Sequence, residues 1–473
     1  MKRYDLIVIG GGAGGLSVAS AAAQLGLSVM LIEKSTKLGG DCLHYGCVPS
    51  KSLIHSAKVR HTFKNAHRFG FDATIIETDL ARVNESVQGV IDSLQPHDSP
   101  ERFVSLGVDL GFGNPRFVSS HEVELNTECY YAKKFVIATG SHSLIPPIPG
   151  LTVCQYVTNE SIFKLKTLPK HLLVLGGGPI GIELAQAMHR LGAHVSIIEM
   201  APHILPMIDE SIAVAMEDTL RKEGIDLYLS SQVMEAWHDH DAKICTLTCQ
   251  DGNGKAFTLT GDKLLIATGR VPNIAGLGLE AAAVAYDKRG IIVDKYLRTS
   301  QKHIFAIGDV TATPLKFTHV AEYHAGIVIS NALFRLRRKT DYRVIPTVVY
   351  TDPEIATVGL SEKQAREKGY RFQVIEMQVK DIDRAITSRE DQGLIKCLVR
   401  RNKILGVAIM GQHAGELIAE FALAMNANLP LRYLTTTVHA YPTMAQLNRR
   451  VINKYFASKL FSDRVRRLVR WLF

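Results

Sequence analysis

Apolar positions near the start of the chain form a short run, "YDLIVI" at residues 4–9, that leads directly into a cluster of glycines. A run of this length bounded by glycine predicts a buried strand entering a tight loop. Residues 13–26 then predict a helix, and "SVMLIEK" at 28–34 predicts a second strand. The same order of strand, loop, helix and strand recurs from residue 171. It predicts a parallel α/β unit that occurs twice.

Both glycine clusters fit the pattern G-x-G-x-x-G, and the strand after each cluster ends in a glutamate. The glycines that fit are Gly10, Gly12, Gly15, Gly176, Gly178 and Gly181. Glu33 lies 23 residues after the first glycine of its copy, and Glu199 lies 23 residues after the first glycine of the other. Such glycines let the backbone approach a pyrophosphate, the helix N-terminus supplies N–H donors, and the carboxylate binds ribose hydroxyls. The matched spacing predicts two dinucleotide sites.

Later segments close each unit and then change in character. "KKFVIATGS" at 133–141 and "DKLLIATGRVPN" at 262–273 predict the last strand of each unit, with a glycine that lets the backbone approach a cofactor. The first unit is interrupted by a helix-like stretch near 51–66 and a polar connection near 95–103. From about Pro346 the pattern is strand-rich, with a later helix near 414–427, which indicates a separate α+β domain. The predicted domain limits are 1–150, 151–272, 273–343, 344–450 and 451–473.

Composition and charge exclude several classes of protein. The 473 residues are 46% hydrophobic and 21% charged, which excludes global disorder, and seven cysteines are too few for a disulfide scaffold. Residues 449–473 carry eight Lys/Arg and one Asp, so this tail holds +7 of the net charge of +9. A nucleic-acid-binding surface on the body is therefore not expected. No stretch approaches the ~20 apolar residues of a membrane span. We expect a cytoplasmic protein, because the first apolar run is a strand and not a signal peptide.

A loop after the Glu33 strand, "GGDCLHYGCVPSK", carries Cys42 and Cys47. A metal site would need further ligands, and no second Cys/His cluster has suitable spacing, so no metal is expected. The position of the loop would place the two thiols beside the reactive ring of the first cofactor.

On these motifs the chain resembles the flavin-dependent pyridine nucleotide-disulfide oxidoreductases, such as lipoamide dehydrogenase, glutathione reductase and mercuric reductase, over about residues 4–450. The resemblance implies a homodimer with FAD-binding, nucleotide-binding, central and interface domains. The implied FAD contacts are Gly10, Gly12, Gly15, Glu33, Lys51, Gly113, Thr139, Gly140 and Asp309. The implied nucleotide contacts are Gly176, Gly178, Ile180, Gly181, Glu183, Glu199 and Gly269.

The same resemblance assigns roles in catalysis. Cys47 matches the thiol next to the flavin, and Cys42 matches the thiol that attacks a substrate disulfide. Lys51 lies one helical turn after Cys47, and Glu183 matches its partner in the family. Hydride would pass from the nicotinamide to the flavin, and electrons would pass on to the cysteine pair and by exchange to an acceptor.

The choice of nucleotide depends on the end of the second strand. The Glu199 carboxylate would bind a free 2′-hydroxyl and repel a 2′-phosphate. NADPH enzymes of the family place arginines just beyond this strand, whereas "EMAPHILP" offers only His203 as a cation. NADH is therefore predicted, and NADPH remains the alternative.

The interface loop "TTTVHAYPTMAQ" departs from the family. Tyr441 stands where lipoamide dehydrogenases and glutathione reductases carry the acid/base histidine, and Gln446 stands where they carry a glutamate. His439 is either a substitute base or a packed interface histidine. Mercuric reductases also carry a tyrosine at the Tyr441 position, but they have a C-terminal cysteine pair, and this chain has no cysteine after Cys397.

The redox loop departs from the family as well. Asp41 replaces the usual threonine and His44 the usual asparagine. Asp41 would disfavour the Cys42 thiolate, and a protonated His44 would favour it. The remaining cysteines, Cys129, Cys154, Cys245, Cys249 and Cys397, are predicted to be scattered, half-buried thiols.

Residues 454–473 predict a basic amphipathic helix. Phe461, Val465, Leu468, Val469 and Leu472 share one face, and Lys459, Arg466, Arg467 and Arg470 lie opposite. Two interpretations stay open: contact with an anionic membrane surface, or docking on the dimer.

The sequence therefore predicts a homodimeric, FAD-containing, NADH-preferring disulfide reductase of the lipoamide dehydrogenase type, acting on a small disulfide or thiol complex. A mercuric-reductase-like reductase of metal–thiol complexes, a membrane-surface NADH:quinone oxidoreductase and a flavin-bound redox sensor are the alternatives.

Overall fold

The computed structural model describes residues 1–239 and 241–473 and divides into two compact units. The first unit consists of Met1–Ser56, Thr78–Pro169 and Lys263–Thr340. The second unit consists of Ala57–Glu77, Lys170–Asp262 and Asp341–Phe473. Each unit joins segments that are distant in the sequence.

The first unit is built on a mostly parallel sheet, as the sequence predicted. Its strands, in spatial order, are β3 (Val108–Phe112), β2 (Val29–Glu33), β1 (Lys2–Ile9), β6 (Glu128–Ile137), β5 (Glu122–Leu125) and β4 (Arg116–Ser119). β1 pairs in parallel with both β2 and β6, and β2 pairs in parallel with β3. β19 (Ile304–Ala306) pairs in parallel with the carboxyl end of β6, and β5 and β4 form an antiparallel extension.

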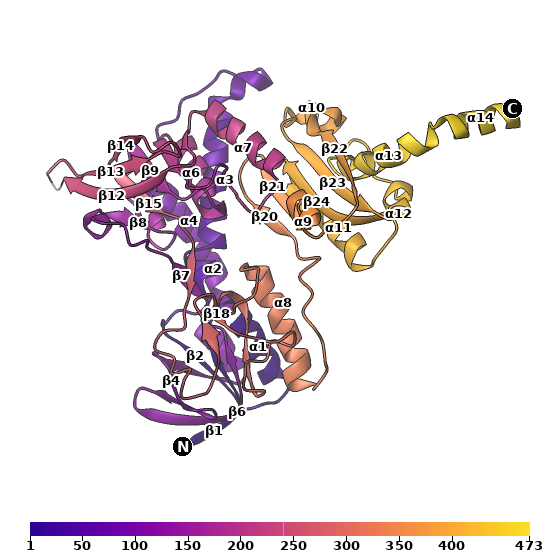
Figure 1. The fold of residues 1–473 in the computed structure, drawn as a ribbon. Helices are drawn as coiled ribbons and strands as arrows, with labels where there is room; N and C mark the ends of the chain where they lie inside the picture. Colours follow the sequence, from indigo (N-terminus) through magenta and orange to yellow (C-terminus); the bar gives the residue numbers. More distant parts are fainter. Residues whose placement is uncertain (240) are drawn as a thin grey trace. The chain divides into compact units, whose positions relative to one another are not determined.

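Two helices cover one face of this sheet, α1 (Ala13–Gln24) and α8 (Thr318–Val328), and they lie side by side in Figure 1. The contact is close because α1 is rich in small residues: a Cβ on Gly14 would lie 3.0 Å from the Ile307 side chain and 3.2 Å from the Ala321 carbonyl oxygen. Leu16 and Val18 of α1 pack in one core with Leu6 of β1 and Ile327 of α8. The helix after the first glycine loop is thus fixed on both sides.

The first unit contains further helices and strands. They are α2 (Gly40–His44), the start of α3 (Cys47–Lys64), α4 (Leu80–Leu94), α5 (Pro100–Ser105), β7 (Ser141–Ser143), β8 (Tyr156–Val157), β15 (Lys263–Ile266), β16 (Arg270–Pro272), β17 (Tyr286–Asp287) and β18 (Gly290–Ile291). The predicted polar connection near 95–103 lies between α4 and β3 and is largely helical. The Ser99 side chain accepts a hydrogen bond from the backbone of Arg102 and caps α5, whose first residue is Pro100.

The second unit contains the second glycine loop. Strands β9 (His171–Leu175), β10 (His194–Ile198) and β11 (Asp226–Tyr228) are parallel, with helices α6 (Pro179–Arg190) and α7 (Glu210–Glu223). An antiparallel sheet follows, formed by β12 (Gln232–Asp239), β13 (Ile244–Gln250) and β14 (Ala256–Gly261). β13 buries Cys245, Leu247 and Cys249 on one face.

The α+β region of this unit is a five-stranded antiparallel sheet in the order β20 (Thr347–Val349), β21 (Glu354–Gly359), β24 (Lys403–Gly411), β23 (Leu394–Arg400) and β22 (Gln373–Gln378). Its helices are α9 (Glu362–Glu367), α10 (Asp383–Ser388), α11 (Ala414–Asn426), α12 (Arg432–Thr436) and α13 (Gln446–Leu460). Phe421 of α11 and Val451 and Ile452 of α13 pack against strand residues such as Ile409 in one core.

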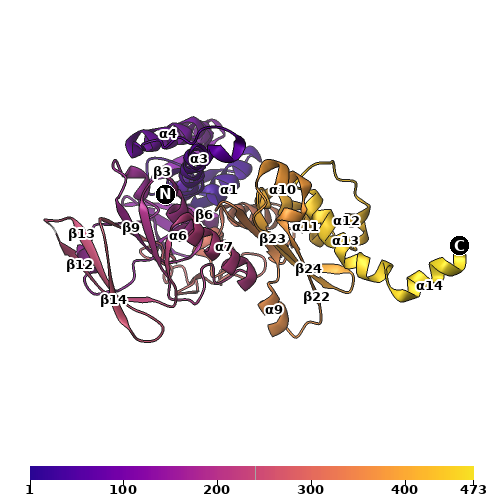
Figure 2. The same cartoon turned by 90° about the horizontal axis from the view of Figure 1, so that it is seen from above.

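The C-terminal segment is two helices, not the single helix that the sequence predicted. α13 ends at Leu460, and α14 (Asp463–Leu472) follows. Ser462 has an extended backbone (φ −67°, ψ 153°), which interrupts the helix. Tyr455 is the last buried residue of α13, and the partly buried Phe456 beside it also packs against the core. In Figures 1 and 2, α14 extends away from β22, β23 and β24. No helix among the described residues is both long and apolar enough to span a bilayer.

Candidate redox and dinucleotide sites

The first glycine loop binds the carboxylate of Glu33 through backbone groups. The Gly11 N–H donates to Glu33 Oε2 at 2.6 Å, and the Ser35 N–H donates to Oε1 at 3.0 Å. Gly10 has φ +110°, and a Cβ on Gly15 would lie 1.9 Å from the Gly10 carbonyl oxygen. Only glycine fits such a turn, which leaves the first N–H groups of α1 uncovered by side chains.

The second glycine loop repeats this geometry closely. The Gly177 N–H donates to Glu199 Oε2 at 2.6 Å, and the Ala201 N–H donates to Oε1 at 2.8 Å. Gly176 has φ +111°. The N-cap of α6 is Gly178, which makes no side-chain cap, and a Cβ there would meet nothing within 4 Å. The residues present in both loops fit a dinucleotide, because each combines a glycine turn, an open helix N-terminus and a carboxylate.

Gly11 and Gly177 are functional positions that the sequence analysis missed. Each stands at the variable position of G-x-G and donates the N–H that orients the glutamate. A Cβ at either position would lie within 3.3 Å of the Cβ of that glutamate. The signal was present in the sequence, because both copies read Gly-Gly-Gly.

His203, the one cation near the end of β10, is bound by acidic side chains. Its Nδ1 lies 3.1 Å from Glu217 Oε1, and its Nε2 lies 3.6 Å from Glu210. The Glu217 carboxylate, which is buried, also accepts from the Ile204 N–H at 3.1 Å. The His203 side chain is therefore already engaged within the loop that follows Glu199.

Other predicted FAD contacts lie at strand ends of the first unit. Gly113 follows β3 with φ +141°, and its N–H donates to the Glu33 carbonyl at 2.9 Å. Thr139 and Gly140 follow β6. Asn273 joins them through three hydrogen bonds: its side chain donates to the Thr139 carbonyl, its carbonyl accepts from the Thr139 hydroxyl, and its N–H donates to the Gly140 carbonyl.

The redox loop begins against the first glycine loop. A Cβ on Gly40, which has φ +61°, would lie 2.7 Å from the Gly12 Cα, so the two backbones touch. Cys42 lies on α2 and Cys47 begins α3. The Cys47 sulfur lies 3.2 Å from the Thr318 hydroxyl at the start of α8, a contact that the sequence analysis missed.

Cys42 and Cys47 are two separate thiols in the structure. The Cys42 thiol donates a hydrogen bond to Cys47, which lowers the pKa of Cys47 to about 6, assisted by Thr318 and by the positive charge of Lys51. The same hydrogen bond, together with burial, raises the pKa of Cys42. The proton of the pair therefore resides on Cys42, and Cys47 is the thiolate.

Asp41 is neutralised by Arg270, a residue that the sequence analysis did not assign. Arg270 Nη2 lies 3.3 Å from Asp41 Oδ2, and Asn159 Nδ2 lies 3.4 Å from Oδ1. Burial raises the pKa of Asp41, and the Arg270 charge opposes this rise. Asp41 in turn raises the pKa of both Cys42 and Cys47, although its contribution is smaller than that of the thiol–thiol hydrogen bond.

Arg270 also links Asp41 to Asp309. The Arg270 Nε donates a hydrogen bond to Ser141 Oγ at 2.8 Å, and the Ser141 hydroxyl donates one to Asp309 Oδ2 at 2.8 Å. His44, the other departure in the redox loop, contacts the Leu38 carbonyl through Nε2 at 2.9 Å. Asp41 and His44, the two positions at which the redox loop departs from the family, are thus each bound by partners within the first unit.

A cavity of about 570 Å³ opens beside Cys47. Its lining residues are Cys47, Val48, Lys51, Ser52, His55, Ser56, Ser86, Val90 and Leu94. Cys47, Lys51 and His55 follow one another at intervals of four residues and so share one face of α3. The cavity places a thiolate, an ammonium and an imidazole beside an apolar wall from α4.

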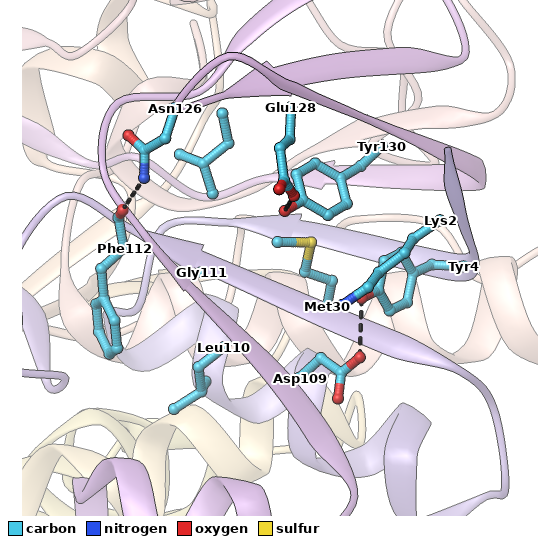
Figure 3. A pocket seen from close by; sticks show the side chains of 11 residues that line it. Lys2, Tyr4, Met30, Asp109, Leu110, Gly111, Phe112, Asn126, Glu128 and Tyr130 are labelled. Atoms are coloured by element: carbon cyan, nitrogen blue, oxygen red, sulfur yellow. Dashed lines mark hydrogen bonds between the residues drawn. The ribbon is translucent and has the colours of Figure 1, made fainter.

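A second cavity of about 510 Å³ lies elsewhere in the first unit and contains none of the predicted site residues. Figure 3 shows its polar wall, where the Tyr4 hydroxyl donates to Asp109 at 2.8 Å and Tyr130 donates to Glu128 at 2.6 Å. These side chains satisfy one another, and the cavity holds no thiol or glycine loop.

Lys51 and Glu183 belong to different units, so their pairing stays a prediction. The Lys51 ammonium donates to Ser50 Oγ at 3.3 Å. Glu183, on α6 with Ile180 and the buried Gly181, accepts from the Tyr350 N–H at 2.9 Å. Gly269 lies in the first unit, apart from the other predicted nucleotide contacts, and its role likewise stays a prediction.

The interface loop exposes Tyr441 and fixes His439. Tyr441 is 70% exposed. His439 Nε2 lies 3.0 Å from Glu420 Oε1, and its Nδ1 lies 3.1 Å from the Thr437 carbonyl. Both partners are acceptors, and together they hold the His439 ring from two sides. Gln446 contacts the Ala440 carbonyl at 3.4 Å.

The other cysteines differ from the redox pair. Cys154, Cys245, Cys249 and Cys397 are buried and Cys129 is exposed. Burial raises the pKa of Cys249 to about 11 and that of Cys397 to about 12. Among residues 1–239 and 241–473, no three His, Cys, Asp or Glu side chains gather in a way that could hold a metal ion.

Comparisons with known proteins agree over most of the chain. A family described as pyridine nucleotide-disulphide oxidoreductase matches residues 4–325, and its dimerisation domain matches residues 345–450. A mercuric reductase of Bacillus cereus is 36% identical over 94% of this chain and 70% of its own length. A dihydrolipoyl dehydrogenase of Thermus scotoductus is 38% identical over 94% of this chain and 96% of its own length.

A solved structure is also similar, the Cu(II) complex of the HOCl-induced flavoprotein disulfide reductase RclA from Escherichia coli. It has a TM-score of 0.85 and 30% sequence identity, and the similarity covers 96% of this chain and 100% of that one.

Proposed function

Because the chain belongs to the class I pyridine nucleotide-disulphide oxidoreductases, which are NAD(P)H-dependent flavoproteins, we propose that it uses NADH to reduce a small disulfide or thiol-bound acceptor through Cys42 and Cys47. The observation that carries this proposal is the hydrogen-bonded thiol pair. One thiol has a pKa of about 6 and is held by Thr318 at 3.2 Å. Such a pair is poised for exchange at neutral pH.

The exchange follows from the roles of the two sulfurs. Cys42, once deprotonated, attacks one sulfur of the substrate disulfide; a mixed disulfide forms and one thiol leaves. Cys47 then attacks the Cys42 sulfur, which releases the second thiol and closes the Cys42–Cys47 bond. FAD, when bound, carries the two electrons of NADH to this bond. The balance is RSSR + NADH + H⁺ → 2 RSH + NAD⁺.

The site also supports a role for Asp41 and Arg270. With Asp41 paired to Arg270 at 3.3 Å, little uncompensated negative charge opposes the Cys47 thiolate. Tyr441 is exposed on the loop that follows α12. We assign it as the proton donor to the leaving thiol in the site of the partner subunit. His439 then positions this loop through Glu420 and does not act as the base.

The preference for NADH is supported by the loop after β10. Glu199 keeps its carboxylate toward the glycine loop, and His203 is bound by Glu217. A 2′-phosphate would therefore meet a negative charge without a free cation. The match to the dimerisation domain supports a homodimer.

Reduction of a metal–dithiolate is the second candidate, and two observations favour it. Tyr441 stands where mercuric reductases carry a tyrosine, and relatives at 34–36% identity bear that name. For mercury the balance is Hg(SR)₂ + NADH + H⁺ → Hg⁰ + 2 RSH + NAD⁺. Cys42 and Cys47 would accept Hg(II) from the thiols before it is reduced.

Anaerobic titration with NADH tests the proposal. The FAD-loaded protein should develop a long-wavelength band from the Cys47 thiolate against the flavin. Cys47→Ser should lose this band and at least about a thousandfold in disulfide reduction, whereas Cys129→Ser, at an exposed cysteine outside the loop, should keep both. Bleaching without a band, equal in all three proteins, would contradict the disulfide mechanism. Comparing turnover with a small disulfide and with Hg(II) bound by excess thiol then separates the two candidates.

A further inference from the structure

Helix α14 has an apolar face and a basic face, and both are exposed to solvent. None of its residues is buried, and Leu468 and Leu472 are 53% and 63% exposed. Val465 and Val469 lie on the same face of the helix as these leucines. Both views show the helix extending away from the sheet of its own unit (Figures 1 and 2).

The opposite face of α14 is basic and almost unpaired. Arg466, Arg467 and Arg470 point around this face. Across the described residues, the single carboxylate within 4.0 Å of an α14 arginine is Asp463, which reaches Arg466 at the limit of that distance. The helix therefore presents net positive charge next to an apolar stripe. Trp471 at its end is 80% exposed.

We infer that α14 binds an anionic lipid surface, lying in the interface with its leucines toward the acyl chains and its arginines among the headgroups. Both faces are used in this arrangement, and an aromatic residue near the end suits the same depth. A nucleic acid would leave the apolar stripe exposed to water. Docking on a second copy of this chain is the competing arrangement, and the ultracentrifugation measurement below separates it from lipid binding.

A break in the helix precedes α14, which contains none of the residues assigned above to catalysis or to cofactor binding. Phe461 and Ser462 interrupt the helix, and Phe461 is itself 62% exposed. Membrane binding can therefore be measured without turnover, and its failure would leave the proposed reductase activity untouched.

Co-sedimentation of the FAD-loaded full chain with vesicles tests the inference. We expect binding to vesicles of phosphatidylcholine that contain ~30% phosphatidylserine, and little binding to vesicles of pure phosphatidylcholine. The triple variant Arg466→Gln, Arg467→Gln, Arg470→Gln should lose on the order of a hundredfold in affinity, about fivefold for each arginine. The double variant Leu468→Gln, Leu472→Gln should lose binding as well.

A control with the same change of charge makes the result specific. Lys222, Lys363 and Arg371 are exposed residues of the same unit, and their replacement by glutamine should leave binding unchanged. Equal loss in the control and in the arginine variant would overturn the inference. So would full binding by the leucine variant, which would indicate general charge attraction or a nucleic acid contaminant. Conversion of the dimer to a monomer by removal of residues after Phe461, seen by ultracentrifugation, would assign the helix to a second copy instead.

Discussion

The two glycine loops have the same backbone geometry and diverge at one position. The Gly39 N–H donates to the Gly11 carbonyl at 2.9 Å, and the Leu205 N–H donates to the Gly177 carbonyl at 2.9 Å. The two residues of each pair are 28 positions apart in the sequence. After this point the first copy continues with Gly40, packed against the glycine loop, and with Cys42. The second copy continues with a proline and leads to α7.

The helices that follow the loops differ in a matching way. α1 presents small residues to α8, whereas α6 buries a polar stripe of Glu183, Gln186 and Arg190. These three side chains bind the segment 350–352 through its backbone and through Asp352. The same glycine-loop geometry therefore occurs in two settings. In the first copy it is followed by the redox loop, and in the second copy its helix binds the α+β region.

Gly15→Ala should have the largest effect, because it attacks the close packing of the first loop. The added Cβ would lie 1.9 Å from the Gly10 carbonyl oxygen. Overpacking of backbone costs on the order of 3 kcal/mol. We expect the purified protein to lose bound FAD and the apoprotein to unfold earlier in denaturant.

The matched control for this change is Gly12→Ala, since a Cβ there meets nothing closer than 3.9 Å. It should weaken FAD binding while the apoprotein keeps its stability. Equal unfolding curves for the two variants would show that the steric account of the first loop is wrong.

Replacing Glu199 or Glu33 by alanine should weaken the binding of a different cofactor in each case. Removing a hydrogen bond to a charged group costs about 1.5–3 kcal/mol, so Glu199→Ala should lower kcat/KM for NADH by about tenfold to a hundredfold. The value for NADPH should fall less, and bound FAD should be retained. Glu33→Ala should show the opposite pattern, with loss of FAD. Steady-state kinetics and the flavin content of each variant measure both effects.

His203→Ala is the control for nucleotide choice. Because His203 is bound by Glu217, its removal should change the ratio of NADH to NADPH use only slightly. A selective fall in NADPH use would mean that this imidazole binds the 2′-phosphate, and the stated preference would then need revision.

Asp41→Asn should have the smallest effect and tests the electrostatics of the redox loop. Cys47 has a pKa of about 6 in place of the ordinary 9.0, so the long-wavelength band of the reduced enzyme should be present above about pH 6 and disappear as the pH falls through that value. Loss of the Asp41 charge removes an influence that raises this pKa, so the midpoint should move to lower pH. A midpoint that stays in place or rises contradicts this assignment.

Much of the fold was predictable because its signals are local. Apolar runs of strand length identified β1, β2, β9 and β10, and the glycine and glutamate spacing identified both loops. The break at Phe461 and Ser462 was missed, since helical periodicity continues through it, and packing against the sheet ends earlier.

The partners of the redox loop could not be predicted in this way. Thr318 and Arg270 reach Cys47 and Asp41 from more than 200 positions away, and neither lies in a pattern that points to those residues. Such contacts arise from how the strands and helices of the first unit assemble. The predicted domain limits and the pairing of Lys51 with Glu183 remain predictions.

The unequal pKa values of the thiols make the chain selective toward alkylating reagents. At pH 7 the thiolate is the reactive form, and Cys47 supplies it while burial keeps Cys249 and Cys397 protonated, with pKa values of about 11 and 12. A limiting dose of iodoacetamide on the NADH-reduced protein would therefore label the redox loop well before these interior thiols. In the Cys129→Ser variant, which lacks the exposed thiol outside the redox loop, covalent labelling can thus count functional sites in a preparation without knowledge of the substrate.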